Sequence, residues 1–442
     1  MPFFRCNRGS EFVAKPAVFS NLTFWVFILG LSGYLAAKLF ATPDWVSMAE
    51  PPAFYQLMLM IKQLFVQLLR MLIAPVVFLS IVSGMLGLTD VTRLKHLGSM
   101  TLIYYCLTTA IAIAIGLTVV FFIHPWEQQG MIEQGSQLLA GAPVVDGEQL
   151  IDPAQSGWVA MLQTLLASAF INPFTALAQT KILALVFNAF LIGLAIALTA
   201  PADSPLVVAI KQLNQAVGKM LSWLLWLLPV GVFAILFDVT LKTAGGVVGQ
   251  LFSFALVVFG ATLIHAVVVL PLLAWLFAGE KPVSLLRKIA SPLVLAFSTS
   301  SSAATLPVSM KTAELNLSVS EPVRSFVLPL GATMNMDGTA LFEGIAAVFL
   351  AYLFGIELSS VAVVMVFLMA MFSSIGAPGM PSGSMAGMQM VMLAVGIPLE
   401  AIALLLVIER PLDTFRTAVN VEGDLVGALV VDRWFGSHLN RD

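Results

Sequence analysis

The chain has 442 residues, of which 59% are hydrophobic and only 10% are charged, against about 25% charged residues in an ordinary soluble protein. No Asp, Glu, Lys or Arg occurs between Lys242 and Glu280 or between Glu357 and Glu400, and each gap exceeds the roughly 20 apolar residues that cross a bilayer. The composition argues against a soluble enzyme and indicates an all-α, polytopic membrane protein. A net charge of −3 without a block of like charge argues against a nucleic-acid partner.

The apolar segments predict eight transmembrane helices in chain order. The leader, residues 1–15, carries three basic residues and is expected in the cytoplasm, because positive charge gathers on that side of a membrane. No Lys or Arg occurs between Lys95 and Lys181, so the acidic stretch within that interval belongs outside. Both termini are then cytoplasmic, in a plasma membrane or, in a bacterium, the inner membrane. The expected spans cover about residues 16–37, 54–86, 101–123, 182–199, 220–237, 247–277, 322–353 and 398–431.

Two further apolar segments do not fit as simple spans. Residues 289–310 have basic residues at both ends, which places both ends inside, and the serine-rich run at residues 298–302 favours a turn. Residues 361–395 repeat the pattern around a glycine- and proline-rich middle. Both segments are therefore expected to be re-entrant helical hairpins, entering from opposite faces, with tips buried in protein or lining a cavity. Such an inverted repeat is typical of transporters, which place their substrate near the midplane.

Polar side chains gather on one face of the last span. They are separated by three or four positions, so they share a helical face with Arg416 at its edge: Glu409, Asp413, Thr417, Asn420 and Asp424. A charge placed in the membrane costs at least about 2.5 kcal/mol, which favours a functional site. The alternative is a buried ion-pair network, between Arg416 and Asp413, that only holds the bundle together.

These residue types indicate a class of substrate. The planar guanidinium of Arg416 suits a carboxylate, while Asp413 offers a counter-ion for an ammonium group, so together they describe a zwitterion with an extra carboxylate. Oxygen ligands from Asp337, Asp424 and Asn335 suit a small hard cation better than a soft metal, which favours coupling to sodium ions. Cys6 and Cys106 predict neither a disulfide framework nor a cysteine metal site, and no organic cofactor is expected.

Four motifs in order resemble the dicarboxylate/amino acid:cation symporters, the glutamate transporter family. They are Thr299 to Pro307, Asn335 to Thr339, the tip from Ser374 to Gly383, and Asp413 to Asp424. Residues 64–75 and 172–174 also look similar to that family, so the likeness covers nearly the whole chain. The resemblance implies a homotrimer and an elevator-type movement. It also implies four parts: a leader (1–15), a largely trimerisation scaffold (16–240) whose third span (101–123) joins the transport domain, the transport domain (241–431), and a cytoplasmic tail (432–442).

The resemblance also implies roles for single residues. The substrate ammonium would be bound by Asp413 and Thr417, and a side-chain carboxylate by Arg416 and Thr339. The α-carboxylate would be held by Ser302 and Asn420, and by main chain at Ser300 and Met380. One sodium site would use Gly331, Asn335, Asn420 and Asp424; a second, main-chain carbonyls at Thr333, Ser374, Ile375 and Ala377; a third, Tyr105, Thr108 and Thr109 with Asn335 and Asp337.

The chain departs from its relatives at several positions. Archaeal members have an arginine at the place of Ser300 and vertebrate glutamate transporters have one at the place of Thr414, and this chain has neither. Pro378 is expected to stiffen the second hairpin tip. Glu343 matches the proton-carrying glutamate of vertebrate members, and an apolar span favours its protonated form; the alternative is a permanently protonated structural carboxyl. His265 is expected to be a hydrogen-bonded structural histidine.

Other function classes remain as alternatives. An intramembrane serine hydrolase would use Ser382 or a serine of residues 300–302 with His265 as base, but the Gly-x-Ser-x-Gly elbow is absent from the sequence, and the chain is not expected to be an enzyme. A passive channel would not concentrate its substrate. Within the family, dicarboxylate relatives typically replace the acid at Asp413, and neutral amino acid relatives often lack the arginine at Arg416. The presence of both favours aspartate or glutamate, with C4-dicarboxylate or neutral amino acid symport as the alternative.

Overall fold

The structure is a computed structural model, and it describes residues 22–86, 95–123, 163, 166–201, 203–243, 245–376, 379, 383–394, 396–397 and 401–439. Every regular element in these ranges is helical. The leader, most of the acidic outer stretch, the extreme C-terminus and Ala377, Pro378, Met380 and Ser382 lie outside the described residues. Within those ranges, five helices are long and apolar enough to cross a membrane, and a sixth crossing results if one bent pair is a single span.

One group of helices comes mainly from the first half of the chain. It comprises α1 (Leu22–Phe40), α2 (Ala53–Met85), α7 (Ile182–Thr199), α8 (Pro205–Leu225) and α9 (Leu228–Thr243), with the short elements η2 (Pro43–Val46) and α6 (Pro173–Ala178). Helix α2 packs against α7, α8 and α9, and α1 packs along α9. The close approach of α1 and α9 depends on Gly33, because a Cβ atom there would overlap the backbone of Phe233.

The span expected at residues 220–237 is instead divided between α8 and α9, which are bent by 50°. Pro229 is the second residue of α9. A proline lacks the N–H that would continue the helix, and it disfavours helical geometry in the residue before it. The proline therefore explains why the apolar run changes direction near Trp226 and Leu227.

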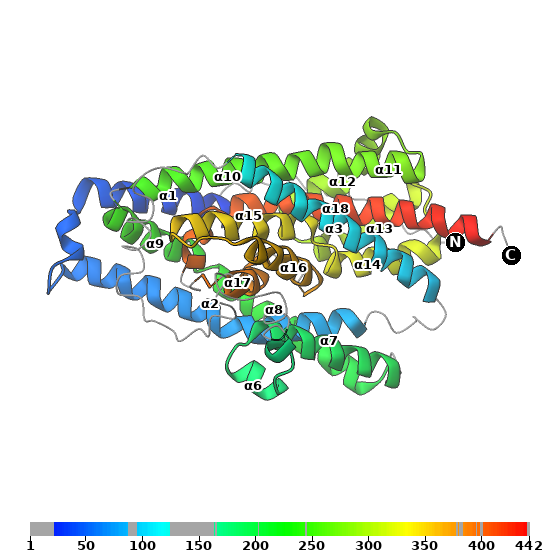
Figure 1. Cartoon of the computed structure of the whole chain (residues 1–442), viewed down its shortest axis with the longest axis horizontal. Helices are drawn as coiled ribbons and strands as arrows, with labels where there is room; N and C mark the ends of the chain where they lie inside the picture. The colour runs from blue at the N-terminus through cyan, green and yellow to red at the C-terminus, as the bar shows by residue number, and fades with distance from the viewer. Residues whose placement is uncertain are drawn as a thin grey trace, which may run out of the picture.

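A second group of helices includes the buried α15 (Asp337–Leu353). It comprises α3 (Lys95–Phe122), α10 (Gly246–Ile264), the π-helix η4 (His265–Val269), α11 (Leu270–Ala278), α12 (Pro282–Thr299), α13 (Ser302–Leu315), α14 (Glu321–Met334), α16 (Ser360–Gly376), α17 (Ser384–Ala394) and α18 (Ile402–Leu439). Every residue of α15 except Tyr352 is buried, and the helix contacts α3, α10, α16, α17 and α18. In Figure 1, α10 to α12 lie along the upper edge, α2, α7 and α8 along the lower edge, and α15 to α17 between them.

The predicted break within residues 289–310 is confirmed. Helices α12 and α13 pack against one another and are joined at Ser300 and Ser301. Ser300 has a φ of 49°, in the left-handed region that costs a residue with a side chain about 1–2 kcal/mol. Helices α16 and α17 form the second packed pair, so the second predicted break is also present.

A second break that was not predicted lies between α14 and α15. The apolar segment expected as a single span at residues 322–353 is interrupted between α14 and α15 at Asn335 and Met336, which both have non-helical backbone angles. Asn and Asp side chains compete with the helical hydrogen bonds of their own backbone. The interruption leaves backbone N–H and C=O groups in the middle of the bundle without the intrahelical hydrogen bonds that a continuous helix would give them.

Candidate functional site

The interruption between α14 and α15 lies at the centre of the site. The Gly338 backbone N–H donates to Asn420 Oδ1 at 2.8 Å, and the Met336 backbone N–H donates to Ser374 Oγ at 3.1 Å. Asn420 belongs to α18 and Ser374 to α16. The freed backbone donors therefore tie the three elements together, and each finds the partner that a buried N–H requires.

Asp337, the first residue of α15, lies in a fully buried polar cluster. Thr109 Oγ1 donates to Asp337 Oδ1 at 2.6 Å, and Thr108 Oγ1 lies 3.4 Å from the same oxygen. His265 Nε2 lies 3.2 Å from Asp337 Oδ2. His265 is thus hydrogen-bonded, as expected of a buried histidine, but its partner is a candidate sodium ligand.

Asp424 and Asn335 form a second oxygen-rich cluster close by. Asn335 Nδ2 donates to Asp424 Oδ1 at 3.0 Å, and among the described residues Asn335 Oδ1 has no hydrogen-bond partner. Gly331 lies so close that a Cβ atom on it would overlap Asp424 Oδ1 and the Tyr105 hydroxyl. Only glycine permits this approach, so the Gly331 backbone lies against the Asp424 carboxylate and the Tyr105 hydroxyl.

The remaining candidate cation ligands lie beside these clusters. Thr109 Oγ1 and Ser374 Oγ are 3.5 Å apart, and Ser374 is buried. A small cavity adjoins them, lined by Leu102, Tyr105, Cys106, Thr109, Leu330, Met334, Met371, Ser374 and Ile375. Within the described part of the chain, no group of three or more His, Cys, Asp or Glu side chains could hold a metal ion, so the ligands brought together are mainly hydroxyl, amide and main-chain oxygens.

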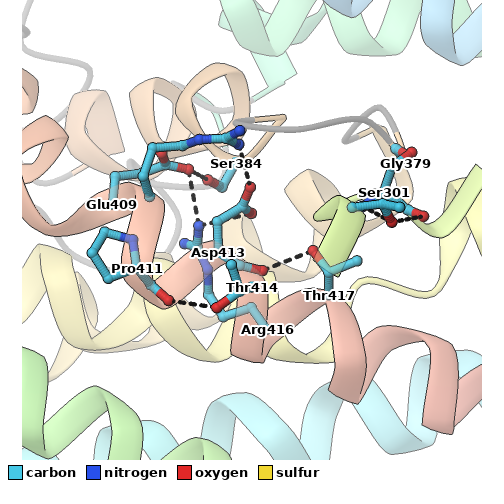
Figure 2. Close-up of polar contacts among 11 residues, drawn as sticks. Ser301, Gly379, Ser384, Glu409, Pro411, Asp413, Thr414, Arg416 and Thr417 are labelled. Atoms are coloured by element: carbon cyan, nitrogen blue, oxygen red, sulfur yellow. Dashed lines mark hydrogen bonds and ion pairs between the residues drawn. The ribbon is translucent and has the colours of Figure 1, made fainter. Parts of the chain in front are cut away.

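Arg416 lies at the centre of an ion-pair network on α18. Its Nη2 is 3.0 Å from Glu409 Oε1 and 3.1 Å from Asp413 Oδ1, and Ser384 Oγ of α17 donates to Glu409 Oε1 at 3.2 Å (Figure 2). The Arg416 guanidinium carbon lies 4.0 Å from the centre of the Phe342 ring. Arg416 is fully buried, yet its Nε and Nη1 have no hydrogen-bond partner within the described ranges.

The tips of the two hairpins touch one another. Ser301 Oγ donates to the Gly379 carbonyl at 2.9 Å, and the Ala303 N–H donates to the same carbonyl at 3.2 Å (Figure 2). Gly379 lies so close to the Ala332 carbonyl that a Cβ atom on it would overlap that oxygen. Ser300 and Ser302 are both buried beneath this contact.

The other predicted substrate residues lie on α15 and α18. Asn420 Nδ2 lies 3.4 Å from Thr339 Oγ1 and 3.2 Å from Met336 Sδ, and Thr417 Oγ1 donates to the Asp413 carbonyl at 2.8 Å. Most of the sequence-predicted residues that the structure describes therefore lie at the break, at the two tips, on one face of α18 and on α3.

Glu343 is fully buried one turn beyond Thr339. Ser373 Oγ of α16 donates to its Oε1 at 2.8 Å, while Oε2 has no partner among the residues that the structure describes. A Cβ atom on Gly387 of α17 would overlap the Ser373 hydroxyl and crowd Glu343 Oε1. The carboxyl group is therefore enclosed by both arms of the second hairpin.

Several features of the site were not predicted from the sequence. Arg410 Nη1 lies 3.3 Å from Asp413 Oδ2, and the spacing of three residues on one helix was a signal that could have identified this pair. Glu422 is a buried acid on α18, two positions before Asp424. The π-helix η4, which presents His265 to Asp337, gave no signal in the sequence, although such bulges are frequent at functional sites.

Known proteins resemble almost the whole chain. Residues 22–434 match the sodium:dicarboxylate symporter family. A Caenorhabditis elegans protein whose name assigns it provisionally to the sodium-dependent excitatory amino acid transporters (glt-4) is 33% identical over 406 residues, covering 84% of this chain and 81% of its own length.

Two neutral amino acid transporters are also similar. Neutral amino acid transporter B(0) of Oryctolagus cuniculus is 32% identical over 387 residues, which is 83% of this chain and 71% of the relative. Human neutral amino acid transporter A is 30% identical over 406 residues, which is 86% of this chain and 75% of the relative. The chain therefore belongs to the sodium:dicarboxylate symporter family, a family of sodium-dependent membrane transporters and not of enzymes.

Proposed function

We propose that the protein imports aspartate or glutamate together with sodium ions. The observation that carries this proposal is that the buried Nε and Nη1 atoms of Arg416 have no hydrogen-bond partner within the described part of the chain. Each of these nitrogens carries an N–H that can make a charge-assisted hydrogen bond to a carboxylate oxygen. A buried charged donor is costly to leave unsatisfied. A substrate with a side-chain carboxylate would remove this cost, and a substrate with a neutral side chain would leave it in place.

The amino group of the substrate would bind next to this edge. Asp413 supplies a carboxylate, and Thr417 lies on the next turn of α18 with its hydroxyl on the Asp413 carbonyl. Thr339 would complete the side-chain carboxylate site, while Ser302, Asn420 and main chain at Ser300 and Met380 would hold the α-carboxylate. The contact of Ser301 with Gly379 supports two hairpin tips that close over such a ligand.

Two alternatives within the family make different demands on these side chains. A C4-dicarboxylate lacks an ammonium group and would place its negative charge near Asp413. A neutral amino acid, the substrate class in the names of two relatives, would bring no side-chain carboxylate to the Nε and Nη1 atoms of Arg416. Both alternatives are outcomes of the experiment below.

We infer that sodium binds at the break between α14 and α15. The first site would use Gly331, Asn335, Asn420 and Asp424; the second, main chain at Thr333, Ser374, Ile375 and Ala377; the third, Tyr105, Thr108, Thr109, Asn335 and Asp337. The unpartnered Asn335 Oδ1 supports a cation at the first of these positions, because a small hard cation prefers such oxygens.

We further propose a homotrimer with elevator-type movement, in a plasma membrane or bacterial inner membrane with cytoplasmic termini. The packing of α1 along α9, and of α2 on α7 to α9, supports a scaffold. The packing of α3, α16, α17 and α18 around the buried α15 supports a transport domain to which the third span contributes. The scaffold would stay in place while the transport domain carries the site across the membrane.

The experiment that tests the substrate class is a binding panel on the purified protein. Aspartate, glutamate, serine and succinate are titrated calorimetrically with and without sodium. We expect aspartate or glutamate to bind most tightly, and only in sodium. Tighter binding of serine or of succinate would replace the proposal with one of the two alternatives.

A further inference from the structure

A second guanidinium reaches the residue that is proposed to bind the substrate amine. Arg410 Nη1 lies 3.3 Å from Asp413 Oδ2, while Arg416 Nη2 lies 3.1 Å from Asp413 Oδ1. Each oxygen of the Asp413 carboxylate thus has its own guanidinium. Arg410 is only 8% exposed, so this pair is a buried feature of the site and not a solvated surface contact.

The two arginines are held with unequal strength. Arg416 is also bonded to Glu409 at 3.0 Å and lies against the Phe342 ring. Arg410 is paired with Asp413 at 3.3 Å, which is longer than the 3.1 Å between Arg416 and Asp413. Arg410 Nε has no hydrogen-bond partner within the described residues. Of the two guanidinium groups, Arg410 is therefore the one that can leave Asp413 at the smaller cost.

We propose that Arg410 is a specificity-determining residue that occupies the position of the substrate ammonium in the empty site. This inference rests on the proposed function in one respect, that Asp413 receives the amine of the substrate. An unpaired buried carboxylate is strongly unfavourable, so Arg410 compensates Asp413 until a substrate arrives. The ammonium group then replaces the guanidinium at Asp413 Oδ2, and Arg410 turns away.

This exchange affects amines and non-amines differently. A substrate with an ammonium group must displace Arg410, which lowers its affinity and speeds its release. A dicarboxylate without an amine leaves the pair of Arg410 and Asp413 intact and gains a nearby positive charge. Arg410 therefore lowers the ratio of amino acid affinity to dicarboxylate affinity. Its removal is expected to raise that ratio.

Aspartate and succinate test the idea, because they differ only by the amine. Dissociation constants for both are measured calorimetrically at saturating sodium in wild type, Arg410→Gln and Arg410→Met, and the release of labelled aspartate is timed. The matched control is Arg324→Gln, which removes an arginine paired with Glu314 at 3.4 Å at the start of α14. Two uncharged replacements are used so that failure of one to fold does not end the test.

We expect either Arg410 variant to bind aspartate about tenfold more tightly and to release it more slowly, because a like charge beside the ammonium has been removed. The same variants should bind succinate more weakly, and Arg324→Gln should match wild type for both ligands. Arg410→Lys, which keeps the charge, should stay closer to wild type. Unchanged binding, or an equal loss for aspartate and succinate, would overturn the proposal.

The failure of the proposed function has a different signature. If wild type prefers serine to aspartate, the acidic substrate class is wrong, and the test of Arg410 passes to serine and 3-hydroxypropanoate, which again differ only by the amine. The same opposite shifts would support the role of Arg410 with a neutral substrate. If wild type binds no amine at all, both the proposed function and this inference are wrong.

Discussion

At the scale of single residues, the site is defined by polar atoms that lack a partner as much as by those that have one. Arg416 is held through a single nitrogen by Glu409 and Asp413. Asn335 is bonded through its amide nitrogen to Asp424. Among the described residues, Nε and Nη1 of Arg416 and the oxygen of Asn335 lack partners, and these are the atoms that suit a carboxylate and a cation.

Replacing Arg416 with lysine keeps a positive charge for Glu409 and Asp413 but removes the planar guanidinium and its additional N–H donors. We expect the dissociation constant for aspartate to rise about a hundredfold, because the lost contact is a buried, charge-assisted pair. Binding of serine should change much less. Equal losses for both ligands in competition binding would show that the residue only maintains the fold of the site.

Replacing Asp424 with asparagine removes one negative charge from the first proposed sodium site. The sodium concentration that gives half-maximal aspartate uptake should rise about tenfold, because the site loses a charged oxygen ligand. Glu357→Gln is the control, since Glu357 is exposed beyond the end of α15. An unaltered sodium dependence for Asp424→Asn would remove Asp424 from the cation site.

Replacing Glu343 with glutamine tests whether this carboxyl group carries a proton. Glutamine can still accept the hydrogen bond that Ser373 donates to Glu343, so the packing is preserved. If the carboxyl is protonated outside and deprotonated inside, wild-type uptake should rise as external pH falls, and the variant should lose this dependence. The same pH profile in both proteins would indicate a structural carboxyl that stays protonated.

At the scale of helices, the proposed site depends on where α12 and α14 end. The break between α14 and α15 exposes the backbone donors of Met336 and Gly338 to α16 and α18. The turn at Ser300 and Ser301 brings the first hairpin onto Gly379 of the second. Continuous helices would satisfy these backbone groups internally and leave no binding atoms in the middle of the bundle.

Gly379 allows the second hairpin tip to take the position that we propose to be the closed one. A Cβ atom there would overlap the Ala332 carbonyl, so Gly379→Ala should hold the tip away from α14 and the first hairpin. We expect aspartate binding to weaken about tenfold or more, because the strain falls on the closed state alone. Gly260→Ala is the control, since nothing lies within 4 Å of a Cβ atom at that position. Equal affinities in the two variants would contradict a role for tip closure.

The sequence predicted those elements whose signals are local. The serine cluster indicated the turn at Ser300, and the spacing of Asp413, Thr417 and Asn420 indicated one helical face. The break at Asn335 was missed because apolar residues continue on both sides of it, which gave the segment the length of a single span. The contact of His265 with Asp337 depends on a π-helix and on two helices distant in sequence, and only tertiary packing determines such a contact.

At the scale of the whole molecule, two groups of helices meet along an apolar boundary. A cavity there is lined by Leu69, Leu72, Val76, Leu221, Leu225, Leu228, Gly383, Met385, Gln389, Ile402 and Leu406. It lies between α2, α8 and α9 on one side and α17 and α18 on the other. An apolar contact such as this one would suit the proposed sliding of two bodies, because little hydrogen bonding would be broken there during the movement.

The central claim is that sodium ions drive the uptake of an acidic amino acid, and gradient-driven accumulation tests it most directly. The purified protein is reconstituted in liposomes with labelled aspartate outside and an inward sodium gradient as the only driving force. We predict accumulation of aspartate above its external concentration, which collapses when the sodium gradient is dissipated. Equilibration without accumulation, or accumulation of succinate or serine but not of aspartate, would contradict the claim.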